Sequence, residues 1–138
     1  MSLSGWHQKA AVVLLVGFML GCTVPSSSAS PPLTAAAAQQ TIDSWNPTYC
    51  KVVEFYGFHK GPESLGPTQM AYVLLANPSD RAQKQIISVA RFQLLTRPDG
   101  QQQWFLTSLV SHAAGLTRRQ GWDNLIIPVK EEAPAATR

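Results

Sequence analysis

A turn flanked by two strand-like segments constrains this fold more than any other part of the sequence. The turn is R-P-D-G at residues 97–100, in which proline presets φ and glycine supplies the positive φ. Residues 85–95 before it alternate apolar and polar side chains, which is typical of a strand with one buried face. The apolar positions there are Ala90, Phe92 and Leu94, set against Arg91 and Gln93. Residues 102–110 then return, so the sequence predicts a β-hairpin.

The returning strand has two possible inward faces. One carries Trp104, Leu106 and Val110, and the other carries Phe105, Thr107 and Leu109. A helix over residues 80–95 is a competing interpretation, because Ile87, Ala90 and Leu94 also have helical spacing. The turn and the β-rich segment behind it favour the hairpin.

Other elements are predicted on both sides of the hairpin. Residues 34–45 are alanine-rich and predict a helix capped by Thr34, with Ile42 and Trp45 toward the core. The N-P pair at 46–47 ends this helix.

Residues 49–58 also fit a helical face, yet their Val, Phe and Tyr content favours a strand. The Gly- and Pro-rich residues 59–67 predict a loop. Residues 69–76 read as a strand closed by N-P-S-D, and residues 124–129 as an edge strand after a glycine-containing loop.

These elements predict an α+β domain in which an N-terminal helix packs on a mostly antiparallel sheet of four to five strands. A helix followed by a curved meander ending in D-G-x-x-x-W-F-L-T-S-L, residues 99–109, resembles the small cystatin-like and nuclear-transport-factor-like domains. The resemblance implies that a small apolar ligand could sit between helix and sheet.

The start of the chain carries an apolar run over residues 10–20 (AAVVLLVGFML). The run has the length of the apolar region of a secretory signal and is well short of the roughly 20 residues that span a bilayer. It ends in Met19-Leu20-Gly21-Cys22, which resembles the lipobox of bacterial lipoproteins. The resemblance implies cleavage before Cys22, a diacylglycerol on its thiol and an acylated amine. Two or three acyl chains would hold the protein permanently at a membrane.

This resemblance divides the chain into four parts. Residues 1–21 would be a removed signal peptide, residues 22–33 a flexible Ser/Pro-rich tether, residues 34–129 the domain, and residues 130–138 a disordered tail. The expected location is an exported membrane face: the outer membrane, the periplasmic side of the inner membrane, or the thylakoid lumen. With Lys9 removed, ten basic residues oppose eight acidic ones, and a net charge of +2 does not suggest nucleic-acid binding.

Cys50 is the second cysteine of the chain. Because Cys22 would be acylated, an intramolecular disulfide is not expected. A small buried hydrophobe is the favoured role of Cys50, and a bridge between two chains is the alternative.

The sequence offers little that resembles a catalytic site. His59 and His112 lack zinc-ligand spacing, and a set of Ser108, His112 and Asp123 lacks a nucleophile-elbow motif. We therefore expect no enzymatic activity, no metal and no cofactor.

The candidate partner-binding residues are Arg118, Arg119 and Trp122, since tryptophan and arginine are favoured at interface hot spots. A tryptophan that caps the sheet edge is the alternative role of Trp122. The expected function is a non-catalytic binding or assembly subunit of an envelope or photosynthetic-membrane complex, docking through a sheet edge or through residues 116–124. The runner-up is a ligand pocket lined by Tyr72, Phe92 and Trp104, and a hydrolase is a distant third.

Overall fold

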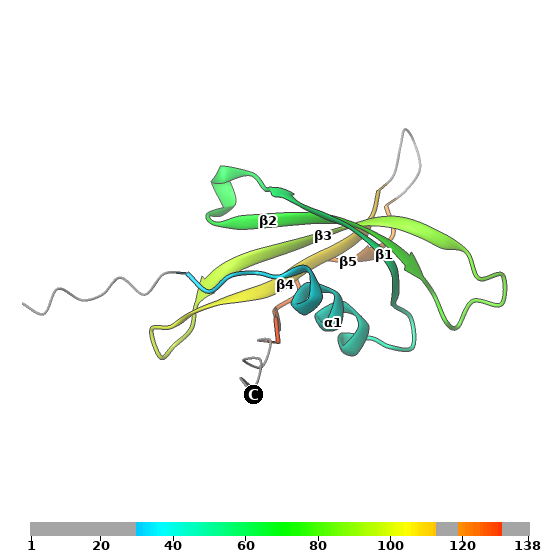
Figure 1. The fold of residues 1–138 in the computed structure, drawn as a ribbon, viewed down its shortest axis with the longest axis horizontal. Coiled ribbons are helices and arrows are strands. Elements are labelled where there is room, and N and C mark those ends of the chain that lie inside the picture. Colours follow the sequence, from blue (N-terminus) through cyan, green and yellow to red (C-terminus); the bar gives the residue numbers. More distant parts are fainter. Residues whose placement is uncertain (1–29, 113–118, 131–138) are drawn as a thin grey trace, which may run out of the picture.

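The computed structural model describes residues 30–112 and 119–130, in which one helix packs against one face of an antiparallel sheet (Figure 1). The elements are α1 (Ala35–Trp45), β1 (Lys51–Lys60), the 3₁₀ helix η1 (Glu63–Leu65), β2 (Thr68–Ala76), β3 (Gln85–Thr96), β4 (Gln102–Ser111), β5 (Gly121–Trp122) and β6 (Ile127–Pro128). The strand order is β1-β2-β3-β4-β5, and β6 also pairs with β4. The predicted α+β class is confirmed for these residues, with six strands in the sheet. The signal peptide, Cys22 and Arg118 lie outside the described residues.

Helix α1 begins and ends where its sequence predicts. The Thr34 side chain accepts a hydrogen bond from the backbone N–H of Ala37 at 3.1 Å, and the helix ends before Pro47. Ala38 and Ile42, four residues apart, are fully buried against the sheet. Trp45 is partly buried against the same core, so both predicted contacts are made.

The hairpin of β3 and β4 is confirmed. Gly100 has a φ of +85°, and its N–H donates to the carbonyl of Arg97 at 2.9 Å. Ala90, Phe92 and Leu94 of β3 are buried as predicted, and the alternation extends back to Ser88. The competing helix over residues 80–95 is wrong, because β3 pairs with β2 on one side and β4 on the other.

A β-bulge in β4 changes which of its residues face the core. Arg91 pairs with Ser108 and Phe92 pairs with Leu106, so Thr107 is an extra residue in the ladder. Leu106 and Leu109 therefore point into the same core, at 0% and 1% exposure, although they are three residues apart. Neither predicted face of this strand is correct, since both assumed unbroken alternation.

Strand β1 is also irregular. It pairs with β2 at Val52, Phe55 and Phe58 on the core side, with register shifts between these positions. The predicted strand is confirmed, but it continues to Lys60, and η1 occupies part of the predicted loop at residues 59–67.

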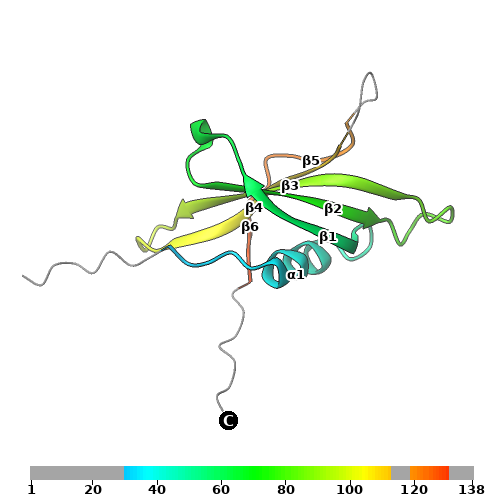
Figure 2. The same cartoon turned by 45° about the horizontal axis from the view of Figure 1, so that its top comes forward.

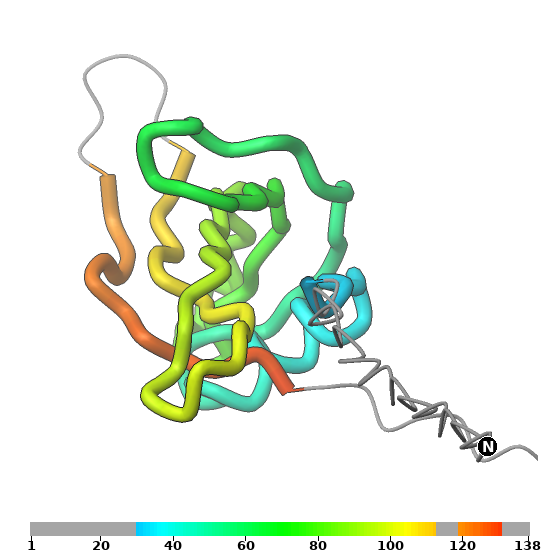
Figure 3. Tube along the Cα trace, turned by 90° about the vertical axis from the view of Figure 1, so that its left-hand side faces the viewer, coloured from blue at the N-terminus to red at the C-terminus, as the bar shows by residue number. Residues whose placement is uncertain are grey.

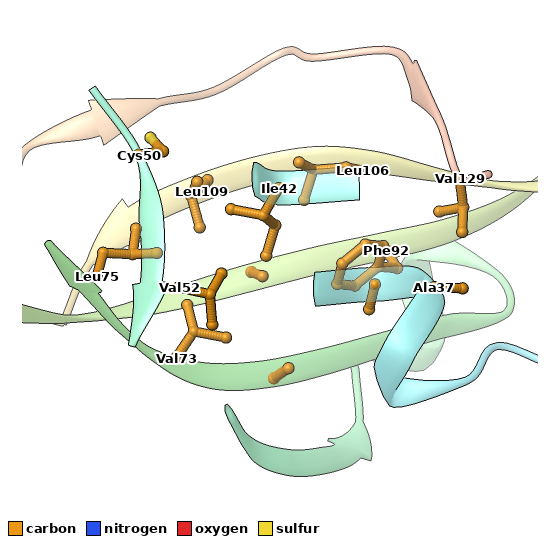
Figure 4. Close-up of a cluster of buried hydrophobic side chains, with 13 residues drawn as sticks. Ala37, Ile42, Cys50, Val52, Val73, Leu75, Phe92, Leu106, Leu109 and Val129 are labelled. Carbon is orange, nitrogen blue, oxygen red and sulfur yellow. The ribbon is translucent and has the colours of Figure 1, made fainter. Parts of the chain in front are cut away.

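The core lies between α1 and the sheet (Figure 4). Cys50 and Leu75 lie at one end of the buried cluster and Val129 lies at the other. Cys50 is 1% exposed, which agrees with the role of a small buried hydrophobe. A bridge to a second chain would require this part of the core to open.

Both ends of the described chain lie beside the start of β4. The indole of Trp104 donates to the carbonyl of Pro31 at 2.7 Å, and Leu33 packs on the core. The backbone N–H of Val129 donates to the carbonyl of Trp104, and that of Lys130 to the hydroxyl of Thr41. The folded unit thus extends on both sides beyond the predicted 34–129.

The two ends of the sheet differ in what they carry. One end, here called the proximal end, holds residues 30–33, η1 and the turn at residues 97–101 (Figure 1). The distal end holds the β2–β3 connection at residues 77–84 and the start of the β4–β5 connection. η1 rises from the face opposite α1 (Figure 2), and the segment after β4 runs back along β4 (Figure 3).

Candidate functional site

The sheet face opposite α1, here called the open face, carries a groove lined by polar and apolar side chains. Most of its strand residues occupy positions that alternate with the core positions, so the sheet directs them away from the helix. The volume of this groove is about 460 Å³. Its lining residues are Met70 and Tyr72 of β2, Val89 and Arg91 of β3, Ser108, Val110 and Ser111 of β4, and His112, Arg119 and Asp123 beyond it.

A row of three rings crosses the open face. The His59 ring stacks on Tyr72 with centroids 5.0 Å apart and an interplanar angle of 19°. The His112 ring meets Tyr72 edge-on at 5.4 Å and 87°. The three rings come from β1, β2 and the end of β4, so pairing of these strands places them together. The row presents an aromatic surface with a polar nitrogen-bearing ring at each end.

Arg91 forms the polar wall of the groove. Its Nη2 lies 3.1 Å from Oδ1 of Asp123, and its Nε donates to the hydroxyl of Thr107 at 3.2 Å. Thr107 also donates to the carbonyl of Arg91. The bulge that adds Thr107 to β4 therefore supplies the hydroxyl that holds this guanidinium, and Arg91 pairs with Asp123, the one carboxylate among the described residues that line the groove.

Ser108, His112 and Asp123 line the same groove, yet they are not linked as a catalytic set. Asp123 is paired with Arg91, and the ring contact of His112 is with Tyr72. No hydrogen bond joins any two of the three within residues 30–112 and 119–130. The same residues contain no cluster of three His, Cys, Asp or Glu side chains that could hold a metal ion.

The two predicted partner-binding residues that the structure describes, Arg119 and Trp122, lie on different faces of the sheet. Arg119 is exposed and lines the open-face groove. Trp122 pairs with Leu109 on the helix side, and its ring meets that of Trp45 edge-on with centroids 5.2 Å apart. Trp122 thus closes the edge of the core, as in the alternative weighed from the sequence.

A second, smaller depression lies at the distal end on the helix side, and we call it the distal hollow. Its volume is about 140 Å³. The lining residues are Tyr49, Cys50, Leu75, Ala76, Asn77, Lys84, Ile86, Ser88, Ser111, Gln120, Gly121 and Trp122. Burial, with a smaller contribution from Asp43, raises the pKa of the Cys50 thiol from 9.0 to about 11. The thiol is therefore protonated at neutral pH and unsuited to nucleophilic attack.

The cavity expected between Tyr72, Phe92 and Trp104 is not formed. Phe92 is fully buried in the filled core, whereas Tyr72 points to the open face. The two side chains therefore lie on opposite sides of the sheet. The open face was not predicted from the sequence, because only the strand positions expected to be buried were considered. The side chains at the alternate positions of the same strands would have indicated this second face.

Comparison with protein-family models, with curated protein sequences and with solved structures gives no significant match. Within the described residues, none of the helical structure has the length and apolar character needed to cross a membrane.

Proposed function

We propose that this protein is a lipid-anchored, non-catalytic bacterial envelope protein that binds a protein partner of a membrane complex through the open face. The observation that supports this most is that α1 covers only one face of the sheet. The other face leaves Tyr72 and Ile87 38% and 45% exposed beside the groove. Exposed apolar side chains gathered on one surface are typical of a binding site.

The state of the core favours docking over an internal ligand site. Ala71, Ala90 and Phe92 are fully buried, so the space between helix and sheet is filled by the protein itself. Binding must then use the surface. The second candidate function is the binding of a small amphipathic ligand in the groove, since 460 Å³ falls within the range of ligand pockets, about 300–1,000 Å³.

The anchor in this proposal is Cys22, acylated after removal of residues 1–21, with α1 as the first element of the mature domain. Eight residue steps separate Cys22 from Ser30. An extended chain spans at most about 3.5 Å per residue, so the domain would stay within about 28 Å of the lipid. Docking would thus take place close to the membrane surface.

Membrane fractionation of cells that express wild type or Cys22→Ala tests the anchor. The wild type should enter the detergent-soluble membrane fraction and incorporate labelled palmitate, and Cys22→Ala should do neither. A wild type in the soluble fraction without label would refute the anchor.

Affinity purification from detergent-solubilised membranes tests the open face. Tyr72→Ser should lose a partner that wild type retains in stoichiometric amount, because the central ring of the open face is removed. Gln40→Ala, at an exposed position of α1, is the matched control and should retain it. Equal recovery with Tyr72→Ser, or no stoichiometric partner with wild type, would contradict docking through this face.

A further inference from the structure

The distal hollow is an apolar depression that the fold leaves open. Tyr49 and Ile86 at its rim are 52% and 43% exposed, while Cys50 and Leu75 are buried beneath them. Trp122, from the edge of the sheet, supplies one wall. Since the protonated Cys50 thiol is neutral, the buried part of the lining carries no charge.

The size of the distal hollow limits what can occupy it. A dry cavity of about 150 Å³ in a protein core holds one benzene molecule, and the distal hollow measures about 140 Å³. That volume equals about five water molecules at about 30 Å³ each, which is too little for an acyl chain. The hollow fits one bulky apolar side chain.

Lys84 is the charged side chain among the described residues that line the distal hollow. No aspartate or glutamate is among those described lining residues, and Asp43, which contributes to the raised pKa of Cys50, is paired with Lys51 at 3.7 Å. Arg81 lies in the same β2–β3 connection as Lys84, next to Asp80, and does not line the hollow. The ion pairs of the described residues involve neither Arg81 nor Lys84. A negatively charged partner segment would therefore be attracted to this rim.

The first described residues of the chain lie away from the distal hollow. Ser30 contacts Gln102 at the proximal end of the sheet, opposite the end that carries residues 77–84 (Figure 1). Residues 30–33 therefore do not cover the hollow.

We propose that the distal hollow is a docking pocket for a single leucine or phenylalanine side chain carried on an acidic segment of a partner protein. The apolar lining would take up the side chain, and Lys84 would attract the acidic flanks. This inference deepens the proposed binding role, yet it depends on neither the lipid anchor nor the open face.

Fluorescence anisotropy with labelled peptides and the detergent-purified full chain tests this proposal. The probes are an acidic peptide with a central phenylalanine (DEGFGED), the same peptide with alanine (DEGAGED) and a basic phenylalanine peptide (KKGFGKK). The acidic phenylalanine peptide should bind at least tenfold more tightly than either of the others. Similar affinity for all three peptides, or no binding of DEGFGED at millimolar concentration, would overturn the proposal.

Variants of the protein test whether the DEGFGED peptide binds at the distal hollow. Ile86→Asp, which puts a carboxylate at the rim, and Lys84→Glu should each weaken DEGFGED binding at least tenfold, with circular dichroism confirming that both variants fold. Tyr72→Ser, on the open face, should leave the affinity for DEGFGED unchanged. Loss with Tyr72→Ser but not with Ile86→Asp would refute the hollow while leaving the proposed open-face function intact.

Sedimentation tests whether the occupant of the hollow is a second copy of this chain and not a separate partner protein. The wild type and Ile86→Asp should sediment alike as the same species. A wild-type dimer that Ile86→Asp dissociates would assign the hollow to self-association and overturn a separate acidic partner.

Discussion

The indole N–H of Trp104 donates a hydrogen bond to the carbonyl oxygen of Pro31 at 2.7 Å, across 73 positions of the sequence. The backbone carbonyl of the same tryptophan accepts a hydrogen bond from Val129 at 2.9 Å. One residue of β4 therefore ties both ends of the folded unit to the sheet. This arrangement fixes the point at which the chain leaves the domain toward Cys22.

Trp104→Phe should release residues 30–33 from the sheet. The substitution removes the indole donor and keeps an aromatic ring, so the free energy of unfolding should fall by about 1 kcal/mol, the typical value of one hydrogen bond. Hydrogen exchange at the amides of Ser30 and Leu33 should become faster than in wild type; Pro31 and Pro32 carry no amide hydrogen. Gln102→Ala, which removes only the exposed contact with Ser30, is the control and should change neither quantity measurably. Unchanged exchange at these two amides in Trp104→Phe would contradict this role.

Gly121→Ala should detach β5 from β4. Gly121 has a φ of +143°, and a Cβ atom there would collide with the carbonyl oxygen of Leu109. The free energy of unfolding, from urea titration, should fall by about 3 kcal/mol because the backbone of β5 must move. Gly100→Ala, at a positive φ with open space around it, should cost only about 1 kcal/mol. Similar costs for the two variants would show that β5 adapts without loss of pairing.

Thr107→Val should weaken the β4 bulge and the Arg91 wall together. The Thr107 hydroxyl joins the side chain and the carbonyl of Arg91, and valine has the same shape without hydrogen-bonding capacity. We expect a loss of about 1–2 kcal/mol in the free energy of unfolding. Thr107→Ser retains the hydroxyl and should lose clearly less. If serine and valine were equally destabilising, the effect would come from packing and not from these hydrogen bonds.

Cys50 should make the stability of the protein depend on alkaline pH. The pKa of Cys50 in the folded protein, about 11, lies above its ordinary value of 9.0 because burial, with a smaller contribution from Asp43, disfavours the thiolate. The stabilisation from the buried thiol is fully present below pH 9, where Cys50 is protonated in both the folded and the unfolded protein. It is lost as pH rises through 11. Two pKa units correspond to about 2–3 kcal/mol.

Urea titrations under reducing conditions from pH 8 to pH 11 measure this effect. The free energy of unfolding of wild type should fall more steeply over this range than that of Cys50→Ala, which retains all the lysines and tyrosines. If the free energy of unfolding fell equally with pH in the two proteins, burial would not raise the pKa of the Cys50 thiol.

The regular parts of the fold could be predicted because their information is local. The alternation at Ala90, Phe92 and Leu94 and the turn closed by Gly100 lie within a few residues of one another, as do the cap and stop of α1. The bulge at Thr107 could not be predicted, since the sequence of β4 is compatible with unbroken alternation. Its register is set by the pairing of Arg91 and Phe92 with β4, which is a tertiary property.

The candidate site was predictable only in part for the same reason. Arg119 was selected because arginine and tryptophan are favoured at interface hot spots, and it lines the groove. Trp122 was grouped with it because the two are close in sequence, but β5 is a strand, and pairing with Leu109 turns Trp122 toward Trp45. The ring row of His59, Tyr72 and His112 depends on contacts between three strands, which no local pattern records.

The irregular register of β1 has a consequence for contacts between separate molecules. β1 is an edge strand, and a straight edge presents unpaired N–H and C=O groups that can template pairing with another chain. The shifts between Val52 and Glu54 and between Phe55 and Phe58 break that row, and a lysine stands at each end of the strand. Edge-to-edge aggregation through β1 is thereby disfavoured, which would matter most at the high local concentration that the proposed lipid anchor would create.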